Sequence, residues 1–171
     1  MDYADNALAT FENMIGTLQH LVRKAQDAGT GDKVLGVKLA EDMFPLETQF
    51  RIAINQLIMA LSRVYGLELA MDEEAYASLD EVSRQISAIK DRLAQARETG
   101  GASAETPVDF TLPNNMRFVM SSEEYLRDWT MPNFYFHTTM AYALLRHVGL
   151  EIGKADFMPH MLRYAKQPDN A

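Results

Sequence analysis

Residues 132–147 read PNFYFHTTMAYALLRH, and this stretch decides the fold. Read as a helix that Pro132 begins, it has apolar side chains on nearly every side, which is typical of a helix in the core of a bundle. A stripe at spacings of three and four predicts the side that faces the core. Its members are Asn133, His137, Met140, Leu144 and Val148, with Ala141 beside them. We therefore expect a histidine, His137, near the centre of a buried helix face.

Three earlier segments predict the other long helices of a bundle, because each repeats apolar residues every three or four positions. Gly29 and Gly31 end the first helix, and the third begins at Ser78, which has capping-box spacing to Glu81. The stripes are Leu8, Phe11, Ile15, Leu18, Val22 and Ala25 in the first; Leu46, Phe50, Ile54, Leu57, Leu61 and Val64 in the second; and Leu79, Val82, Ile86, Ile89, Leu93 and Ala96 in the third.

The second of these helices is apolar on another side as well. Pro45 suits its first position, and Ile52, Ile58 and Met59 lie outside its stripe. A helix that is apolar on two sides is normally buried on two sides. This one is therefore either the central helix of the bundle or a helix shared between the core and a dimer interface.

A small β-hairpin is predicted at about residues 108–120, because apolar and polar residues alternate on both sides of the turn PNN. The segment SSEEYLRDW that follows predicts a short helix capped by Ser121 or Ser122. Pro132 is expected to separate this short helix from the last long one. A C-terminal extension is expected over about residues 150–171.

The composition limits the compartment and the partners. The chain has 171 residues, which suits one domain over residues 1–171, and it has no cysteine. Its net charge is −8 and no cluster of Lys and Arg stands out, so we expect neither nucleic acid nor an anionic membrane as a partner. The acidic N-terminus is unlike a signal peptide, and no apolar run is long enough for a membrane span. A soluble cytoplasmic protein is expected.

His137 allows three interpretations, because an imidazole inside a bundle must be hydrogen-bonded or ligated. It is a neutral structural histidine bonded to a backbone carbonyl or a facing polar side chain, a metal ligand, or a member of a ligand pocket with an acid or base role. Asn133 lies one turn earlier, so the two side chains are close enough to meet.

The stretches DMFPLETQF and FTLPNNMRFVMSSEEYLRDWTMPNFYFHTTMAYALLRHVGLEIGKADF, with the aliphatic first helix, span nearly the whole chain. On these stretches the chain resembles the DinB-like (YfiT-like) superfamily of four-helix bundles, and within it a bacterial branch of unknown function. The resemblance implies an all-α four-helix bundle of the up-down-down-up type, with a small β-hairpin inserted before the last helix.

The resemblance also implies a possible metal site. Many DinB-like proteins hold a divalent metal with three histidines, one on the second helix and two spaced four apart on the fourth. That pair falls here on Asn133 and His137, and the second helix, residues 45–65, has no histidine, with Gln49 as its nearest polar candidate. Asn and Gln are weak, neutral donors for such metals. The site is therefore expected to be degenerate and without a cofactor; a divalent metal, if bound, would be held by His137.

Three functions remain open at this stage, and the chain is assigned neither as an enzyme nor as a non-enzyme. The first is a bundle with a small-ligand pocket formed by His137, Asn133 and Gln49. The second is a divalent-metal-dependent transferase or isomerase, since some relatives are thiol-dependent enzymes of these kinds. The third is a purely structural or interaction protein.

A homodimer is expected because aromatic and arginine side chains, which interfaces favour, share one face of the last helix. This face consists of Tyr135, Tyr142 and Arg146. In the extension, Asp156 is expected to fold back toward Arg146 or His147 and form a structural ion pair. His20 is expected to face solvent.

Overall fold

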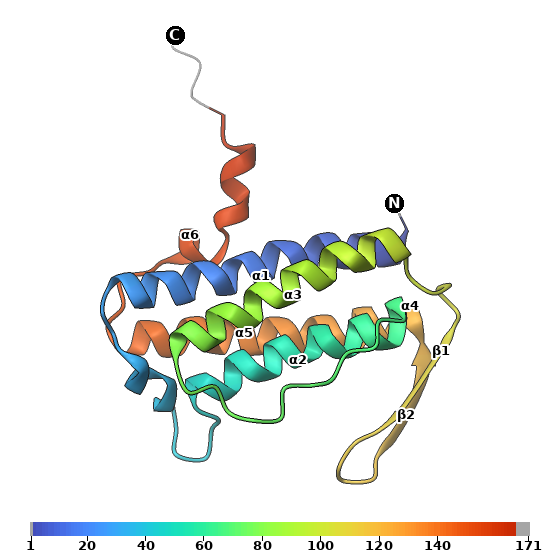
Figure 1. Ribbon diagram of the computed structural model, residues 1–171, viewed down its shortest axis with the longest axis horizontal. Coiled ribbons are helices and arrows are strands. Elements are labelled where there is room, and N and C mark those ends of the chain that lie inside the picture. The colour runs from blue at the N-terminus through green and yellow to red at the C-terminus, as the bar shows by residue number, and fades with distance from the viewer. Residues whose placement is uncertain (1, 167–171) are drawn as a thin grey trace.

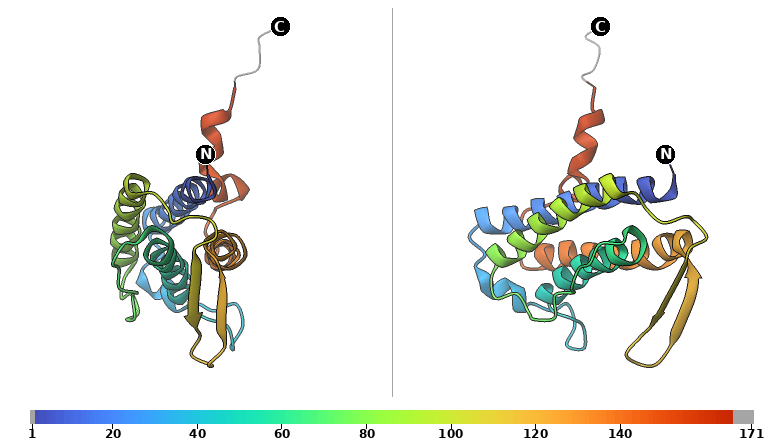
Figure 2. Two further views of the ribbon diagram at one scale, coloured as in Figure 1. Left: turned by 90° about the vertical axis from the view of Figure 1, so that its right-hand side faces the viewer. Right: turned by 45° about the vertical axis from the view of Figure 1, so that its right-hand side comes forward.

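The computed structural model describes residues 2–166, and four long helices make up most of it (Figure 1). They are α1 (Tyr3–Asp27), α2 (Leu46–Tyr65), α3 (Leu79–Thr99) and α5 (Met131–His147), with a short 3₁₀ helix, η1 (Asp32–Gly36), between α1 and α2. α1 and α5 run in one direction and α2 and α3 in the other, which confirms the up-down-down-up bundle. α2 packs against both α3 and α5, and Figure 2 shows the four helices nearly end-on.

The helix ends follow from the local sequence. The Ser78 hydroxyl accepts a hydrogen bond from the Glu81 amide at 3.1 Å and caps α3, as predicted. Pro45 is the cap residue of α2, so this helix begins one residue later, at Leu46. α2 ends at Tyr65, and the cap residue Gly66 has a φ of 70°, in the left-handed region that glycine adopts without strain.

The last helix is longer than predicted, and Pro132 does not begin it. Helix α4 (Ser122–Glu124), a π-helical segment η2 (Tyr125–Thr130) and α5 follow one another without a break, and Ser121 caps the whole run. A proline inside an α-helix clashes with the carbonyl four residues earlier. The π segment widens the helix directly before Pro132, because Met131 N–H bonds to the carbonyl of Leu126, five residues back. This turn lets the helix continue through the proline.

The predicted hairpin is confirmed. β1 (Pro107–Thr111) pairs antiparallel with β2 (Arg117–Ser121), and Phe110 is opposite Phe118. Both phenyl rings contact Trp129 of η2, with ring centroids 5.0 and 5.2 Å away. The hairpin extends from one end of the bundle (Figure 1) and is attached there by this aromatic cluster.

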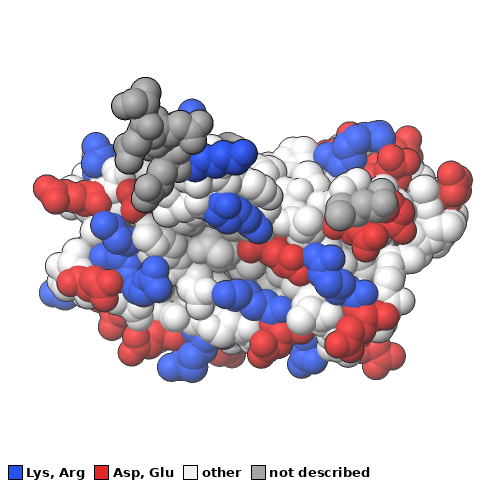
Figure 3. Space-filling view, turned by 90° about the horizontal axis from the view of Figure 1, so that it is seen from above, with Lys and Arg blue, Asp and Glu red and all other residues white. Residues whose placement is uncertain are grey.

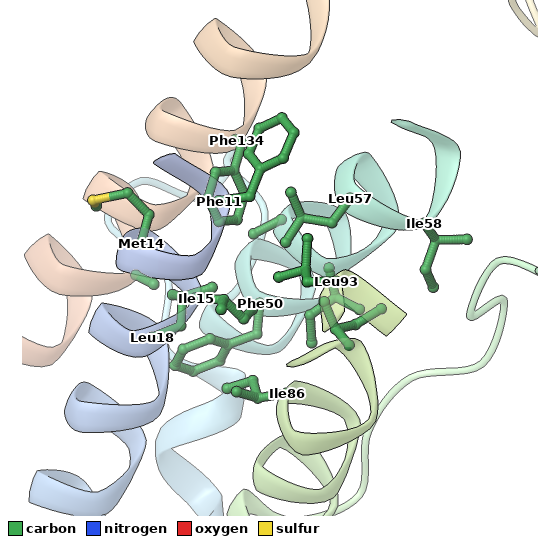
Figure 4. Packing of buried hydrophobic residues seen from close by; sticks show 14 of the residues in the cluster. Phe11, Met14, Ile15, Leu18, Phe50, Leu57, Ile58, Ile86, Leu93 and Phe134 are labelled. Carbon is green, nitrogen blue, oxygen red and sulfur yellow. The ribbon is translucent and has the colours of Figure 1, made fainter. Parts of the chain in front are cut away.

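The phase of α5 differs from the prediction. Its buried residues are Phe134, His137, Thr138, Ala141, Leu144 and Leu145. Val148, which was expected in the core, is 38% exposed, and His137 lies at the edge of the buried side instead of its centre. The edge-to-face contact between Phe134 and Phe11 of α1, with centroids 6.0 Å apart, fixes this phase (Figure 4). A helix that is apolar all round has no unique inner face in its sequence, so the predicted stripe overlaps the buried side at His137, Ala141 and Leu144 but omits Phe134, Thr138 and Leu145.

The C-terminal segment folds back onto α1, and its ion pair differs from the prediction. It contains α6 (Lys154–Phe157) and a 3₁₀ helix, η3 (Pro159–Tyr164), which projects from the bundle (Figure 1). Asp156 bonds to His20 of α1 at 2.8 Å, and not to Arg146 or His147. His20 is therefore only partly exposed. The part of the predicted extension over residues 167–171 lies outside the described residues.

The surface is mixed in charge. Figure 3 shows acidic and basic side chains interspersed on the face that contains α1 and α3. Across the described residues, none of the helices combines the length and the apolar character that a membrane crossing requires. That the protein has no nucleic-acid partner and is cytoplasmic stays a prediction.

Replacing Leu145 by alanine should lower the free energy of unfolding by about 2–5 kcal/mol, because this side chain is fully buried and its loss leaves a cavity. Val148→Ala is the control, at a residue of the face that the sequence predicted to be buried. It should lower the free energy of unfolding by less than about 1 kcal/mol. Chemical denaturation measures both. A larger loss for Val148→Ala than for Leu145→Ala would contradict the observed phase of α5.

Candidate functional site

The structure brings two of the three predicted site residues together. His137 of α5 is 9% exposed, and its Nδ1 lies 2.8 Å from Oε1 of Gln49 on α2. The expectation that His137 is buried with a partner on a facing helix is confirmed. Asn133 does not join this pair, because its amide nitrogen donates to the carbonyl of Trp129 at 2.7 Å. The pairing of α2 with α5 thus places one polar contact at the edge of an apolar interface.

A second hydrogen bond fixes the direction of the first. Gln49 Nε2 donates to the backbone carbonyl of Phe44 at 3.1 Å. A carbonyl can only accept, so the amide nitrogen of Gln49 must face Phe44 and its oxygen must face His137. Nδ1 of His137 is then the donor. In the neutral ring, Nε2 therefore has the free lone pair.

Burial keeps this imidazole neutral. Loss of solvation lowers the pKa of His137 from 6.5 to about 4, because the charged form is poorly accommodated among apolar side chains. At neutral pH the ring is uncharged and is a weak base. The same burial explains why an amide, and not a carboxylate, is a sufficient partner for it.

Nε2 of His137 is the open side of the site. This nitrogen has no hydrogen-bond partner among the described residues. It is also not one of the unpartnered polar atoms that are shut off from solvent there, so it keeps contact with solvent. The ring of Phe136 stands perpendicular to the imidazole, with centroids 5.1 Å apart, and is 56% exposed. Phe44, whose carbonyl anchors Gln49, is 57% exposed. A hydrogen-bond acceptor thus lies beside exposed aromatic surface.

The donor set does not fit a divalent metal. A catalytic site of this kind needs about three imidazole or carboxylate ligands. Residues 2–166 contain no group of three His, Cys, Asp or Glu side chains placed to hold an ion. Gln49 is engaged with Nδ1 of the histidine and with Phe44, and the amide nitrogen of Asn133 is engaged with Trp129. Only the single Nε2 atom of His137 remains as a good ligand.

Some buried polar residues of α2 and of the helical run that contains α5 were missed by the sequence reasoning. Gln56 of α2 is 6% exposed, and its Oε1 has no partner among the described residues. The hydroxyls of Thr130 and Thr138, on the helix that also contains His137, are fully buried and likewise unpartnered there. The signal for Gln56 was its spacing of seven from Gln49, which places both amides on one side of α2.

Glu47, in the first turn of α2, has a structural role. Glu47 accepts hydrogen bonds from Arg51 at 2.8 Å, from Thr48 at 2.9 Å and from the Tyr76 amide at 3.1 Å. It thereby ties the α2–α3 connection to α2. Asn55 assists by exchanging two hydrogen bonds with the backbone of that connection. These contacts engage the Glu47 carboxylate in holding the loop, which accounts for its burial.

Two open surface depressions of about 600 Å³ each lie away from His137. One is at the ends of α1 and α5, around Lys24, Thr30 and Leu150. The other is beside the α2–α3 connection, around Met71 and Tyr76. Neither is lined by Gln49, Asn133 or His137, so these depressions give no shape for a ligand at the histidine.

The comparisons with known proteins agree with this architecture. A crystal structure described as a DinB family member protein from Shewanella denitrificans has the same fold, with a TM-score of 0.73, 24% sequence identity, and coverage of 96% of this chain and 92% of that one. The fold is therefore that of a DinB-like helical bundle. Residues 4–158 match the family model described as Domain of unknown function (DUF1993), and the chain belongs to this family. No curated protein matches the chain.

The stability of the protein should depend on pH through His137. The pKa is 6.5 for an ordinary histidine and about 4 for this buried one, so below pH 6.5 the unfolded chain binds a proton that the folded chain does not. The free energy of unfolding should therefore fall as the pH drops from 6.5 to 4, by up to about 3 kcal/mol.

Urea denaturation at several pH values measures this loss. His137→Gln should remove this contribution to the slope, whereas His147→Gln, at an exposed position on the same helix, should keep the wild-type slope. An unchanged slope in His137→Gln would show that the imidazole is not desolvated in the folded protein.

Proposed function

We propose that this protein is a homodimeric DinB-like bundle that binds a small molecule at His137 and has no resident metal. The single observation that supports this proposal is the pair of hydrogen bonds from His137 through Gln49 to the Phe44 carbonyl. These bonds engage Nδ1 of His137 with a residue of its own chain, and they leave the lone pair of Nε2 available to a ligand.

A binding role is favoured over general-base catalysis by the basicity of the imidazole. Proton abstraction is most effective when the pKa of the base lies near the working pH. Burial lowers the pKa of His137 to about 4, so at neutral pH its Nε2 accepts a hydrogen bond but is a poor proton acceptor. The described residues also supply neither a second titrating group bonded to this ring nor a metal-ligand set. The alternative, a divalent-metal-dependent transferase or isomerase, would need donors that do not assemble here.

The dimer proposal rests on the outer side of α5. Tyr135 is 37% exposed and Arg146 is exposed as well, and aromatic and arginine side chains in contact with water favour an interface. Tyr142 contributes less than the sequence suggested, because it packs edge-to-face on Phe157 of its own chain. The second apolar side of α2 is also partly used within the chain, since Ile58 is buried.

Purified protein should contain no stoichiometric zinc, nickel or other transition metal, because one imidazole and neutral amides hold such ions weakly. His137→Gln should shift the melting temperature equally with and without a chelator. Elemental analysis and thermal denaturation on the same sample measure both. About one metal ion per chain, with a chelator-sensitive melting curve that His137→Gln abolishes, would favour the enzyme alternative.

Light scattering should give the mass of a dimer at micromolar concentration. Tyr135→Ser should shift the mass toward a monomer, because it removes an exposed aromatic side chain from the proposed interface. Leu162→Ser is the matched control, at a 75% exposed apolar residue of η3 that lies outside this interface. A monomer mass for the wild type, or dissociation by Leu162→Ser alone, would contradict the proposal.

A further inference from the structure

Resting on the proposed ligand site at His137, we infer that its ligand is a neutral aromatic molecule with one hydrogen-bond donor, for which a phenol is the simplest representative. The inference goes beyond the proposed function by specifying charge, shape and hydrogen-bonding sense. Each of these three properties follows from a different observation.

The hydrogen-bonding sense follows from the tautomer. The Phe44 carbonyl fixes the orientation of the Gln49 amide, and the Gln49 oxygen in turn fixes the proton on Nδ1 of His137. Nε2 can then only accept. A ligand that offers only acceptor atoms, such as an ether or a ketone, would leave this lone pair unpartnered when it excludes water, and would lose the free energy of one hydrogen bond.

The neutrality of the ligand follows from the uncharged site residues. His137, Gln49 and Asn133 form their hydrogen bonds with one another or with backbone carbonyls, and none of them takes part in the ion pairs of the described residues. A carboxylate or phenolate would direct its own lone pairs at that of Nε2. A cation would lose hydration without meeting an opposite charge. A neutral O–H or N–H donor avoids both costs.

The aromatic character follows from the ring that packs on the imidazole. Phe136 stands edge-on to the imidazole at 5.1 Å and leaves more than half of its surface exposed. A flat apolar ring that donates to Nε2 would cover phenyl surface that otherwise contacts water.

The test uses phenol, anisole and benzoate with the wild-type protein labelled with ¹⁵N-histidine. Phenol has the donor, anisole replaces the O–H with a methyl ether, and benzoate adds a negative charge to a similar ring. The ¹⁵N resonance of Nε2 in His137 reports hydrogen bonding directly. His147, an exposed histidine on the same helix, is the internal control in each spectrum.

Phenol should shift the His137 Nε2 resonance in a saturable manner, with an affinity at least about fivefold higher than that of anisole, as expected from one net hydrogen bond. Benzoate should leave this resonance unshifted, and no probe should shift His147 in the same saturable way. In His137→Phe, which keeps a planar ring but lacks the reporting nitrogen, titration calorimetry should show that phenol loses its advantage over anisole. In Gln49→Leu, which frees the tautomer, the advantage should shrink.

The remaining outcomes separate the two levels of the proposal. Equal affinities for phenol and anisole, or tighter binding of benzoate, would overturn the ligand class and leave a ligand site at His137 standing. If none of the three probes shifts His137, the site itself is wrong and the proposed function fails with it. Because the main comparison is made on the wild-type protein, it does not depend on the folding of any variant.

Discussion

The packing of α5 against α2 is the contact on which the core and the candidate site both depend. α5 has apolar side chains all round, so burying it needs neighbours on more than one side, and α2 and α1 supply them. Phe134 enters this core against Phe11 and thereby sets the rotation of the helix (Figure 4). With that rotation fixed, His137 comes to the edge of the interface, close enough to α2 to reach Gln49 and close enough to the surface to keep one nitrogen open.

The π-helical segment before α5 serves the same packing. It lets one helix run from Ser122 through Pro132, and in doing so it presents Tyr125 and Trp129 to the hairpin. Arg63 of α2 completes this end of the bundle: its guanidinium lies 4.5 Å from the centroid of the Phe110 ring and donates to the Tyr125 hydroxyl at 2.8 Å. The hairpin, which would be marginal alone, is thus attached to the two helices that also form the histidine site.

The site differs in kind from a metal centre built on the same scaffold. A metal site needs several ligands held around one point, whereas here the residues near the histidine are committed to one another. Gln49 bonds the inner nitrogen of His137, and Asn133 bonds the backbone of its own helix. What remains is one neutral acceptor beside aromatic surface. The proposed function takes this acceptor as the partner of a neutral donor.

The sequence by itself determined the helices and the hairpin, because periods of 3.6 and 2 in apolar residues are local signals. The likeness to DinB-like bundles rested on longer motif stretches. His137 was named because a polar residue on an apolar helix face needs a partner, and Gln49 was named through the resemblance. The sequence did not determine the phase of α5, because an all-round apolar helix contains no local mark of its inner side. Nor did it determine that Asp156 bonds His20, 136 positions earlier, or that Gln49 is oriented by the Phe44 carbonyl. Only the tertiary structure decided these contacts, because side-chain partners across helices depend on how each helix is rotated in the packed core.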